Sequence, residues 1–319
     1  MWSKSCILAA AVAALAQFAN VPAADAADAV RVGKAVPFAW TFTPVEVGLE
    51  AGIWAKHGLQ PQVTGFGGDA RMQQALTAHS IDFGLGSGPG MGFMAKGVPA
   101  KAVAAFATSP RNLALVVGPN SPITDVSQTK GKKFGITTVG SLTDWLLKRM
   151  ALAQGWKHDD VIAVPLGGLE TSLAGLKTGQ VDGLVLATEV SYGLEEKKEA
   201  KIIANFGSYA PKFHTHVIFA RNELIEKQPD VVKRFVTAWF ETIAWMKANR
   251  QKTIEITGKL IRLSPAVAAR TYDEEIGMLK DDGRFDPEAI ALIKTSLVEM
   301  KILEAVPADE VMFTTKFVQ

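Results

Sequence analysis

The chain repeats one structural pattern at a spacing of about one hundred residues. The stretches "FGGDARMQQALTAHSIDFGLGSGP" (66–89) and "LGGLETSLAGLKTGQVDGLVLATE" (166–189) share an order of features. Each reads as a Gly-Gly turn, a short helix, an aliphatic-Asp step and an apolar strand. Few letters are identical, so the evidence is the shared order of elements. The repetition predicts two similar units built from strands and helices.

The segments around each copy extend this pattern. Strand, helix, strand, helix and strand follow one another at 30–87 and again at 133–188. Thr43 with Glu46, and Ser141 with Asp144, have the spacing of helix capping boxes. We therefore predict an α/β fold of two lobes, each a mainly parallel sheet flanked by helices.

The last hundred residues turn to helix. The stretch 229–249 has one apolar stripe and begins with Pro229, a favoured first helical residue. Apolar strands at 112–118 and 216–220 flank the second unit, and we interpret them as the two crossings between lobes. The predicted organisation is lobe 1 at 30–112 plus 217–319, with a helical C-terminal part, and lobe 2 at 113–216.

The first residues have the features of a signal peptide. Lys4 precedes an apolar run over 7–16, and Ala24-Asp25-Ala26 offers a small-x-small cleavage site. A membrane anchor or a buried helix is the alternative, but the run is too short to span a bilayer. We therefore predict that residues 1–26 direct export to the periplasm. The one cysteine, Cys6, leaves with them, which excludes disulfides and cysteine chemistry in the mature chain.

The charge and hydropathy of the sequence argue against a nucleic-acid partner and against a membrane-spanning segment in the mature chain. The formal net charge is +2, and removal of Lys4 with Asp25 leaves it unchanged. No long basic block is present, so we expect no nucleic-acid partner. No later apolar run reaches spanning length, so we expect a soluble exported product. We also expect a monomer.

Candidate ligand contacts follow the predicted strands. In open α/β sheets, ligands bind beyond the carboxyl ends of the strands, where free N–H groups begin the helices. Alternatives stay open: Thr43 and Ser141 can be helix caps, Gly68 can serve a tight turn, and Trp40 and Phe42 can pack or stack on a ligand. The candidates are Trp40, Phe42, Thr43, Gly68, Asp69, Ser87, Gly88, Ser141, Leu142, Thr143, Thr188, Glu189 and His216.

Three other residues that could carry chemistry, Asp82, Asp182 and His214, are placed outside this set. Asp82 and Asp182 precede apolar strands and are interpreted as turn or cap residues. His214 and His216 have the spacing of one strand face, but a metal site needs a third ligand, so a solvated strand entry is the favoured interpretation. No hydrolase or metalloprotease motif is present, and we predict no catalytic residue, no metal and no cofactor.

Several segments resemble one family, the periplasmic solute-binding proteins of ABC importers. Within this family, the resemblance is to the group whose members bind sulfonates, taurine, nitrate or the pyrimidine precursor of thiamine. It rests on the order of loose motifs over 30–319. They are "PVEVGLEAGIWAKHGLQPQV", "GGDARMQQALTAHSIDFGLGSGP", "TKGKKFGI", "GSLTDWLLKRMALAQG", "LKTGQVDGLVLATE" and "EKQPDVVKRFVTAWFETIAWMKAN".

The resemblance implies a type II two-lobed clamp that closes on one small organic solute and delivers it to a membrane permease. Glu189-Val190 replaces the family's common Glu-Pro, and Asp144 at a helix entry opposes a bare sulfonate or nitrate. A heterocyclic, aromatic or carboxylated solute therefore fits better, with Arg71 as the one arginine near these loops. The alternatives are an exported enzyme using Glu189, Asp69 or the two histidines, and a ligand-sensing subunit of a membrane receptor.

Overall fold

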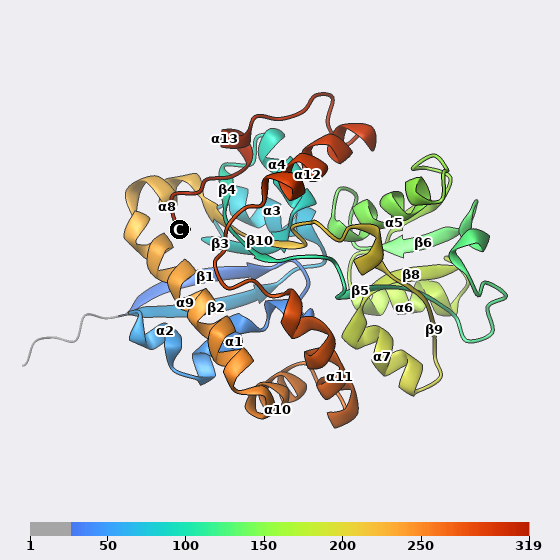
Figure 1. The fold of residues 1–319 in the computed structure, drawn as a ribbon, viewed down its shortest axis with the longest axis horizontal. Helices are drawn as coiled ribbons and strands as arrows, with labels where there is room; N and C mark the ends of the chain where they lie inside the picture. Colours follow the sequence, from blue (N-terminus) through green and yellow to red (C-terminus); the bar gives the residue numbers. More distant parts are fainter. Residues whose placement is uncertain (1–26, 319) are drawn as a thin grey trace, which may run out of the picture.

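Two five-stranded sheets lie side by side along the long axis of the molecule (Figure 1). The computed structural model describes residues 27–318, so the predicted signal peptide lies outside the described residues. The first sheet has the order β2-β1-β3-β10-β4 and contains β1 (Asp28–Lys34), β2 (Leu59–Gly65), β3 (Phe83–Ser87), β4 (Ala100–Ala107) and β10 (His216–Arg221). The second has the order β7-β6-β8-β5-β9 and contains β5 (Leu113–Val117), β6 (Lys133–Ile136), β7 (Ile162–Pro165), β8 (Gly183–Ala187) and β9 (Lys201–Asn205).

The two sheets have the same topology. In each, three strands pair in parallel, and a fourth strand runs antiparallel between the third and the edge strand. Strand β10 holds this antiparallel position in the first sheet, and β5 holds it in the second. The α/β two-lobed fold expected from the repeat is therefore confirmed. Below, lobe 1 and lobe 2 mean the first and second sheets with the helices packed on them.

Helices cover both sheets. Lobe 2 carries α5 (Leu142–Ala153), α6 (Leu169–Lys177) and α7 (Thr188–Glu196). The first sheet is accompanied by α1 (Pro44–Glu50), α2 (Ile53–Lys56), α3 (Asp69–Thr77) and α4 (Gly92–Ala95). The C-terminal helices are α8 (Asn222–Lys227), α9 (Pro229–Ala248), α10 (Arg250–Leu260), α11 (Pro265–Glu275), α12 (Pro287–Glu299) and α13 (Asp309–Met312). Short 3-10 turns are η1 (Trp40–Phe42), η2 (Pro89–Met91), η3 (Val126–Thr129), η4 (Phe206–Tyr209) and η5 (Ile276–Met278).

Helix α9 anchors the core of lobe 1. Its Phe235 stacks on Phe83 of β3 with ring centroids 3.8 Å apart, and Trp54 of α2 packs beside it. Full burial of such side chains contributes on the order of 2–3 kcal/mol each. Two later helices reach lobe 2: Ser296 of α12 accepts a hydrogen bond from Trp145 of α5 (2.6 Å), and α11 packs on α7 (Figure 1).

Several local expectations are wrong. The segment that follows Thr43 is not one continuous helix: it is interrupted at Gly52, whose φ is 73°, and Leu49 is exposed. Neither capping box forms, because Glu46 pairs with Lys34 and the Thr43 hydroxyl bonds the carbonyl of Trp40. Strand β9 and helices α7 and α10 were not predicted from the sequence.

Asp82 and Asp182, which immediately precede β3 and β8 in the two repeated units, have matching roles. The Oδ2 atom of Asp82 accepts the N–H of Arg31 in β1, and that of Asp182 accepts the N–H of Lys133 in β6. Asp82 also binds the guanidinium groups of Arg31 and Arg221, both at 2.7 Å. Hydrogen bonds from these arginines hold the pKa of Asp82 below its usual value against the opposing effect of burial. Both aspartates are thus structural, at the amino-terminal edge of their sheets.

No helix among residues 27–318 has the length and apolarity to cross a bilayer.

The two aspartates form a matched pair for mutation. We expect Asp82→Asn to lower the free energy of unfolding by about 2 kcal/mol, because it leaves the poorly exposed Arg221 without its main counter-charge. Asp182→Asn weakens one backbone hydrogen bond and should cost about 0.5–1 kcal/mol. Urea denaturation of the mature chain measures both values. Equal losses would contradict the assigned difference in roles.

Candidate functional site

A cavity of about 280 Å³ lies between the lobes. Its walls are the segments that follow the parallel strands of both sheets, together with the first residues of the antiparallel strands β5 and β10. Lobe 1 contributes residues 35–39, 42, 65–69, 71, 87 and 216. Lobe 2 contributes residues 112–113, 136–137, 142–143, 167–169, 172, 185–187 and 190. The helix-initiating edges of the two lobes therefore face one another, as the strand order predicts.

The two Gly-Gly turns of the repeat meet beside this cavity. A Cβ atom on Gly67 would lie 3.4 Å from the backbone of both Gly167 and Gly168. A Cβ on Gly68, whose φ is 118°, would lie 2.7 Å from the hydroxyl of Thr138. Real Cβ atoms do not approach other atoms that closely, so only glycine permits this contact at 68. In this structure the two lobes thus approach each other closely beside the cavity, and we call this arrangement the closed form.

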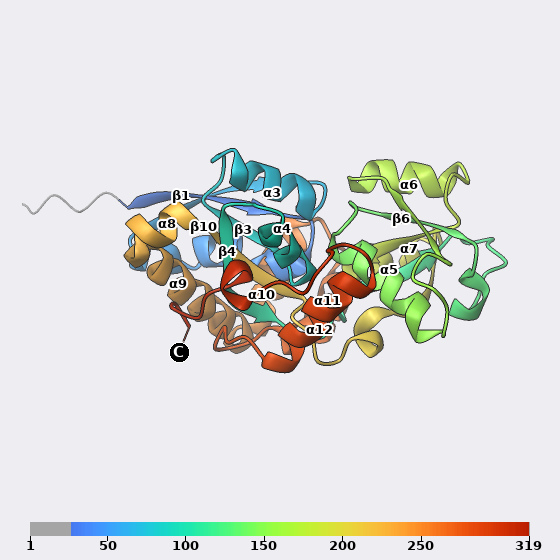
Figure 2. The same ribbon diagram turned by 90° about the horizontal axis from the view of Figure 1, so that it is seen from above.

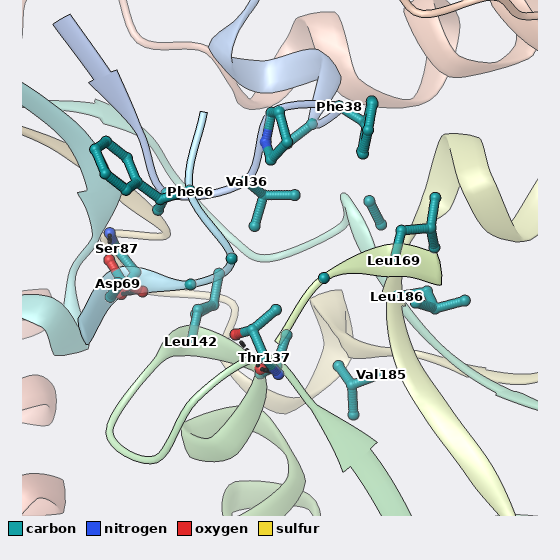
Figure 3. A pocket seen from close by; sticks show the side chains of 18 of the residues that line it. Val36, Phe38, Phe66, Asp69, Ser87, Thr137, Leu142, Leu169, Val185 and Leu186 are labelled. Carbon is teal, nitrogen blue, oxygen red and sulfur yellow. Dashed lines mark hydrogen bonds between the residues drawn. The ribbon is translucent and has the colours of Figure 1, made fainter. Parts of the chain in front are cut away.

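The lining is mostly apolar. Side chains from both lobes surround the space (Figure 3). The labelled apolar residues are Val36, Phe38, Phe66, Leu142, Leu169, Val185 and Leu186. Such walls with a few polar groups are typical of sites for small organic molecules.

The charged groups of the lining are one cation and one carboxyl group. Arg71, on the first turn of α3, has a guanidinium nitrogen 3.3 Å from the Cβ position of Gly167, so it reaches across the two turns. Within residues 27–318 it forms no ion pair. The carboxyl group belongs to Asp69, and burial raises its pKa. The lining therefore favours an anionic group beside Arg71.

Asp69 has a defined structural task. Its Oδ1 accepts the N–H of Ser87 and its Oδ2 accepts the Ser87 hydroxyl, each at 3.0 Å. The Ser87 hydroxyl oxygen also accepts the N–H of Gly90 at 3.1 Å. These bonds tie the start of α3 to the end of β3 and fix both side chains at the wall of the cavity (Figure 3).

Three hydroxyl groups cluster where α5 begins. Thr137, Ser141 and Thr143 lie 2.9–3.0 Å from one another, and Thr143 also accepts the N–H of Thr137. Because these hydroxyls bind each other, Ser141 does not cap α5. Helices α3 and α6, which begin at the same cavity, also have no side-chain cap. Their first N–H groups are left for a polar or anionic ligand atom.

His216 is a neutral wall residue. Burial lowers its pKa to about 3, and the ring lies 2.8 Å from the amide nitrogen of Asn112 and 3.3 Å from the carbonyl of Gly86. His214 accepts the N–H of Asp286 at 2.7 Å, and burial lowers its pKa to about 4. The expectation that both histidines mark a solvated strand entry is wrong, because both are buried.

The sequence candidates divide into two sets. Those in the lining are Phe42, Gly68, Asp69, Ser87, Leu142, Thr143 and His216. Those outside it are Trp40, Thr43, Gly88, Ser141, Thr188 and Glu189. Whether any lining residue touches a ligand stays a prediction.

The residues outside the lining are occupied by internal contacts. Trp40 is fully buried against Tyr272, with centroids 6.0 Å apart, and its backbone N–H donates to Glu189 (2.8 Å). The Gly88 backbone packs on the carbonyl of His214, and Thr188 donates to Glu275. Trp40 therefore packs in the core, which removes the interpretation that its indole stacks on a ligand.

Asp144 also differs from its expected role. Its Oδ2 accepts the N–H of Gly140 (2.8 Å) and pairs with Lys148 (2.9 Å), and it lies outside the lining. Its charge is compensated, so the argument that it opposes an anion in the cavity is wrong.

Some residues of the cavity lining were not predicted from the sequence. The predicted first strand ran to residue 38, whereas β1 ends at Lys34, and the loop 35–39 lines the cavity. Gly167 and Gly168 carried a usable signal, namely their match to Gly67 and Gly68 in the repeat. Leu113, Val185 and Leu186 carried none, since buried strand residues look alike in sequence.

Known proteins resemble the chain in sequence and in fold. A Brucella abortus protein named only as a binding protein is 29% identical over 242 residues, covering 74% of this chain and 73% of its own. A Bacillus subtilis protein whose name associates it with aliphatic sulfonates is 27% identical over 232 residues, covering 71% and 68%.

Two solved structures show the breadth of the fold. The alkanesulfonate-binding protein of Xanthomonas axonopodis pv. citri, bound to MOPS, has a TM-score of 0.75 at 17% identity, covering 88% of this chain and 95% of its own. A desulfurization enzyme has a TM-score of 0.63 at 15% identity, covering 91% and 97%. These likenesses concern the fold alone.

Comparison of the sequence with models of protein families shows which family the chain belongs to. The sequence model of the family described as NMT1/THI5 like matches residues 40–253, which include strands of both sheets and every helix start that lines the cavity. The relatives named as binding proteins agree with a solute-binding role. The chain therefore belongs to the NMT1/THI5-like family.

Proposed function

We propose that this chain is the periplasmic substrate-binding component of an ABC-type importer, and that it captures a small organic anion with an apolar body. The observation that carries the proposal is a largely apolar cavity walled by both lobes, with Arg71 at the meeting point of the two Gly-Gly turns. A membrane permease would then receive the solute from the closed form.

The size and lining of the cavity limit the ligand. An apolar cavity of about 150 Å³ suffices for benzene, so a volume of about 280 Å³ suits a molecule of one or two rings or a short branched chain. Arg71 and the uncapped helix starts supply donors for a carboxylate or a sulfonate. An aromatic or other apolar acid meets both requirements.

Closure gives the binding step its mechanism. A ligand that contacts both lobes gains its full contacts only when the lobes meet, so it shifts the population toward the closed form. The closed form presents one outer surface that joins the two lobes, which is what a permease can recognise.

The enzyme alternative has less support from the contacts. Glu189 and His214 lie outside the lining, and the Ser87 hydroxyl donates to Asp69 rather than to a histidine. A turnover assay on bound solutes distinguishes this alternative from binding alone. Neighbouring genes for a permease and an ATPase would distinguish an importer from a receptor subunit.

The experiment that tests the proposed function is identification of the bound solute. Mass spectrometry of the exported protein gives co-purifying molecules, and a thermal-shift series with benzoate, benzenesulfonate and neutral benzamide tests the charge requirement. A true ligand at one hundred times its Kd should add about 2.7 kcal/mol of stability. Stabilisation by benzamide but by neither anion would contradict the ligand class.

Arg71 provides a test by substitution. We expect Arg71→Gln to weaken binding of the stabilising anion by roughly 10- to 100-fold, the usual value of a lost charge-assisted hydrogen bond. Arg71→Lys keeps the charge and should lose less. Isothermal titration measures both constants, with benzamide as the neutral control. Unchanged anion affinity in Arg71→Gln would contradict the role of this residue.

The Gly-Gly turns provide a second test. We expect Gly68→Ala to weaken ligand binding by at least about tenfold, because its methyl group would meet Thr138 of the opposite lobe at a backbone φ that alanine rarely adopts. Gly168→Ala is the matched control: its φ is −78° and nothing lies within 4 Å of the added methyl group. Titration of both variants should show a loss in the first alone. Equal affinities would mean that this contact does not limit closure.

A further inference from the structure

Two buried carboxyl groups lie outside the cavity, where lobe 2 meets helix α11. Glu189 is the second residue of α7, Glu275 is the last residue of α11, and both are at most 1% exposed. Glu189 Oε1 accepts the N–H of Trp40 in η1 (2.8 Å), a bond that joins lobe 2 to lobe 1. Thr188 donates its hydroxyl proton to Glu275.

The pair has no close counter-charge. Within residues 27–318, neither carboxyl forms an ion pair, and the Oε2 atom of each has no hydrogen-bond partner. Lys34 of β1 acts on Glu189 from a distance but is paired with Glu46 at 2.7 Å. The other titratable or charged groups that face the pair are Arg111 before β5, Tyr192 of α7, and Tyr272 and Glu274 of α11.

Two neighbouring carboxyl groups without a counter-charge cannot both be ionised at low cost. Burial raises the pKa of Glu189 to about 7, and burial together with the charge of Glu189 raises the pKa of Glu275 well above its usual value. A proton on Glu275 lets this carboxyl donate a hydrogen bond to that of Glu189. The closed form therefore holds more protons near neutral pH than two solvated glutamates would.

We propose that closure of the two lobes is coupled to proton uptake by the Glu189–Glu275 pair. Opening breaks the bond between Trp40 and Glu189, admits water to the pair and releases the proton. The proposal rests on the closing motion of the proposed function but not on the identity of the solute.

The sign of the coupling follows from the direction of the shift. The closed form has the higher pKa, so the contribution to closure is complete below the ordinary value of 4.5 and is lost as pH rises through about 7. If the pKa of Glu189 is 4.5 in the open form and about 7 in the closed form, the ratio of closed to open molecules should fall about tenfold from pH 6 to pH 8. Above pH 8 the ratio should level off.

The test measures closure directly and needs no ligand. Helices α3 and α6 lie on the same side of the molecule on different lobes (Figure 2). Gln74 of α3 and Glu170 of α6 are exposed and can be replaced by cysteine for spin labels. The mature chain has no other cysteine if cleavage removes Cys6. Distance distributions at pH 6 and pH 8 should show the short-distance population falling at the higher pH. An unchanged distribution in the wild-type chain would overturn the proposal.

Three variants make the assignment specific. Glu189→Gln should abolish the pH dependence, whereas Glu275→Gln should keep the transition, because its amide is still a neutral hydrogen-bond donor beside Glu189. Glu196→Gln is the matched control: it lies on α7 and bonds Ser264 at the start of α11, but it is exposed. This control should behave as wild type. The proposal fails if Glu189→Gln keeps the tenfold change, if Glu275→Gln abolishes the transition, or if Glu196→Gln also abolishes it. A failed solute screen would bear on the proposed function alone.

Discussion

The close approach of the two Gly-Gly turns beside the cavity is the constraint on which the rest of the structure depends. Gly67 and Gly68 meet Gly167, Gly168 and Thr138 at distances that leave no room for a Cβ atom at position 68. The contact closes a space whose walls come from both lobes. It also brings three helix starts without side-chain caps to one place, so the same geometry supplies enclosure and hydrogen-bond donors.

The two edges of each sheet have different tasks. At the amino-terminal edge, Asp82 accepts the backbone N–H of Arg31 in β1, Asp182 accepts that of Lys133 in β6, and Asp82 also forms two arginine pairs. At the carboxyl edge, polar groups bind one another or are left free, as the hydroxyl cluster around Thr143 shows. Stability is therefore concentrated at the edge that faces away from the cavity, and the loops at the other edge are free to serve a ligand.

Much of the fold and part of the candidate site could be predicted from the sequence. The repeat gave two like sheets, and the apolar strands taken as crossings became β5 and β10, which occupy equivalent antiparallel positions. The failures have one physical cause: each side chain contacts a residue of another segment instead of the partner that the local sequence pattern suggests. Glu46 pairs with Lys34 instead of closing a capping box, and Trp40 packs on Tyr272 instead of facing the cavity. A local sequence pattern shows which side chains need a hydrogen-bonding or packing partner. Only the folded structure shows which residue lies close enough to be that partner.

The position of Glu189 connects the charge of the cavity with the contact between the lobes. A carboxylate facing the cavity beside Arg71 would neutralise the one cation of the lining and disfavour an anionic solute. Glu189 instead turns toward Trp40 and Glu275, where its charge is buried away from the cavity. Asp69 stays in the lining, but burial raises its pKa, so its negative charge is also disfavoured. Glu189 thus adds no negative charge to the lining, and in the coupling proposed above its carboxyl binds a proton more tightly when the lobes are closed than when they are open.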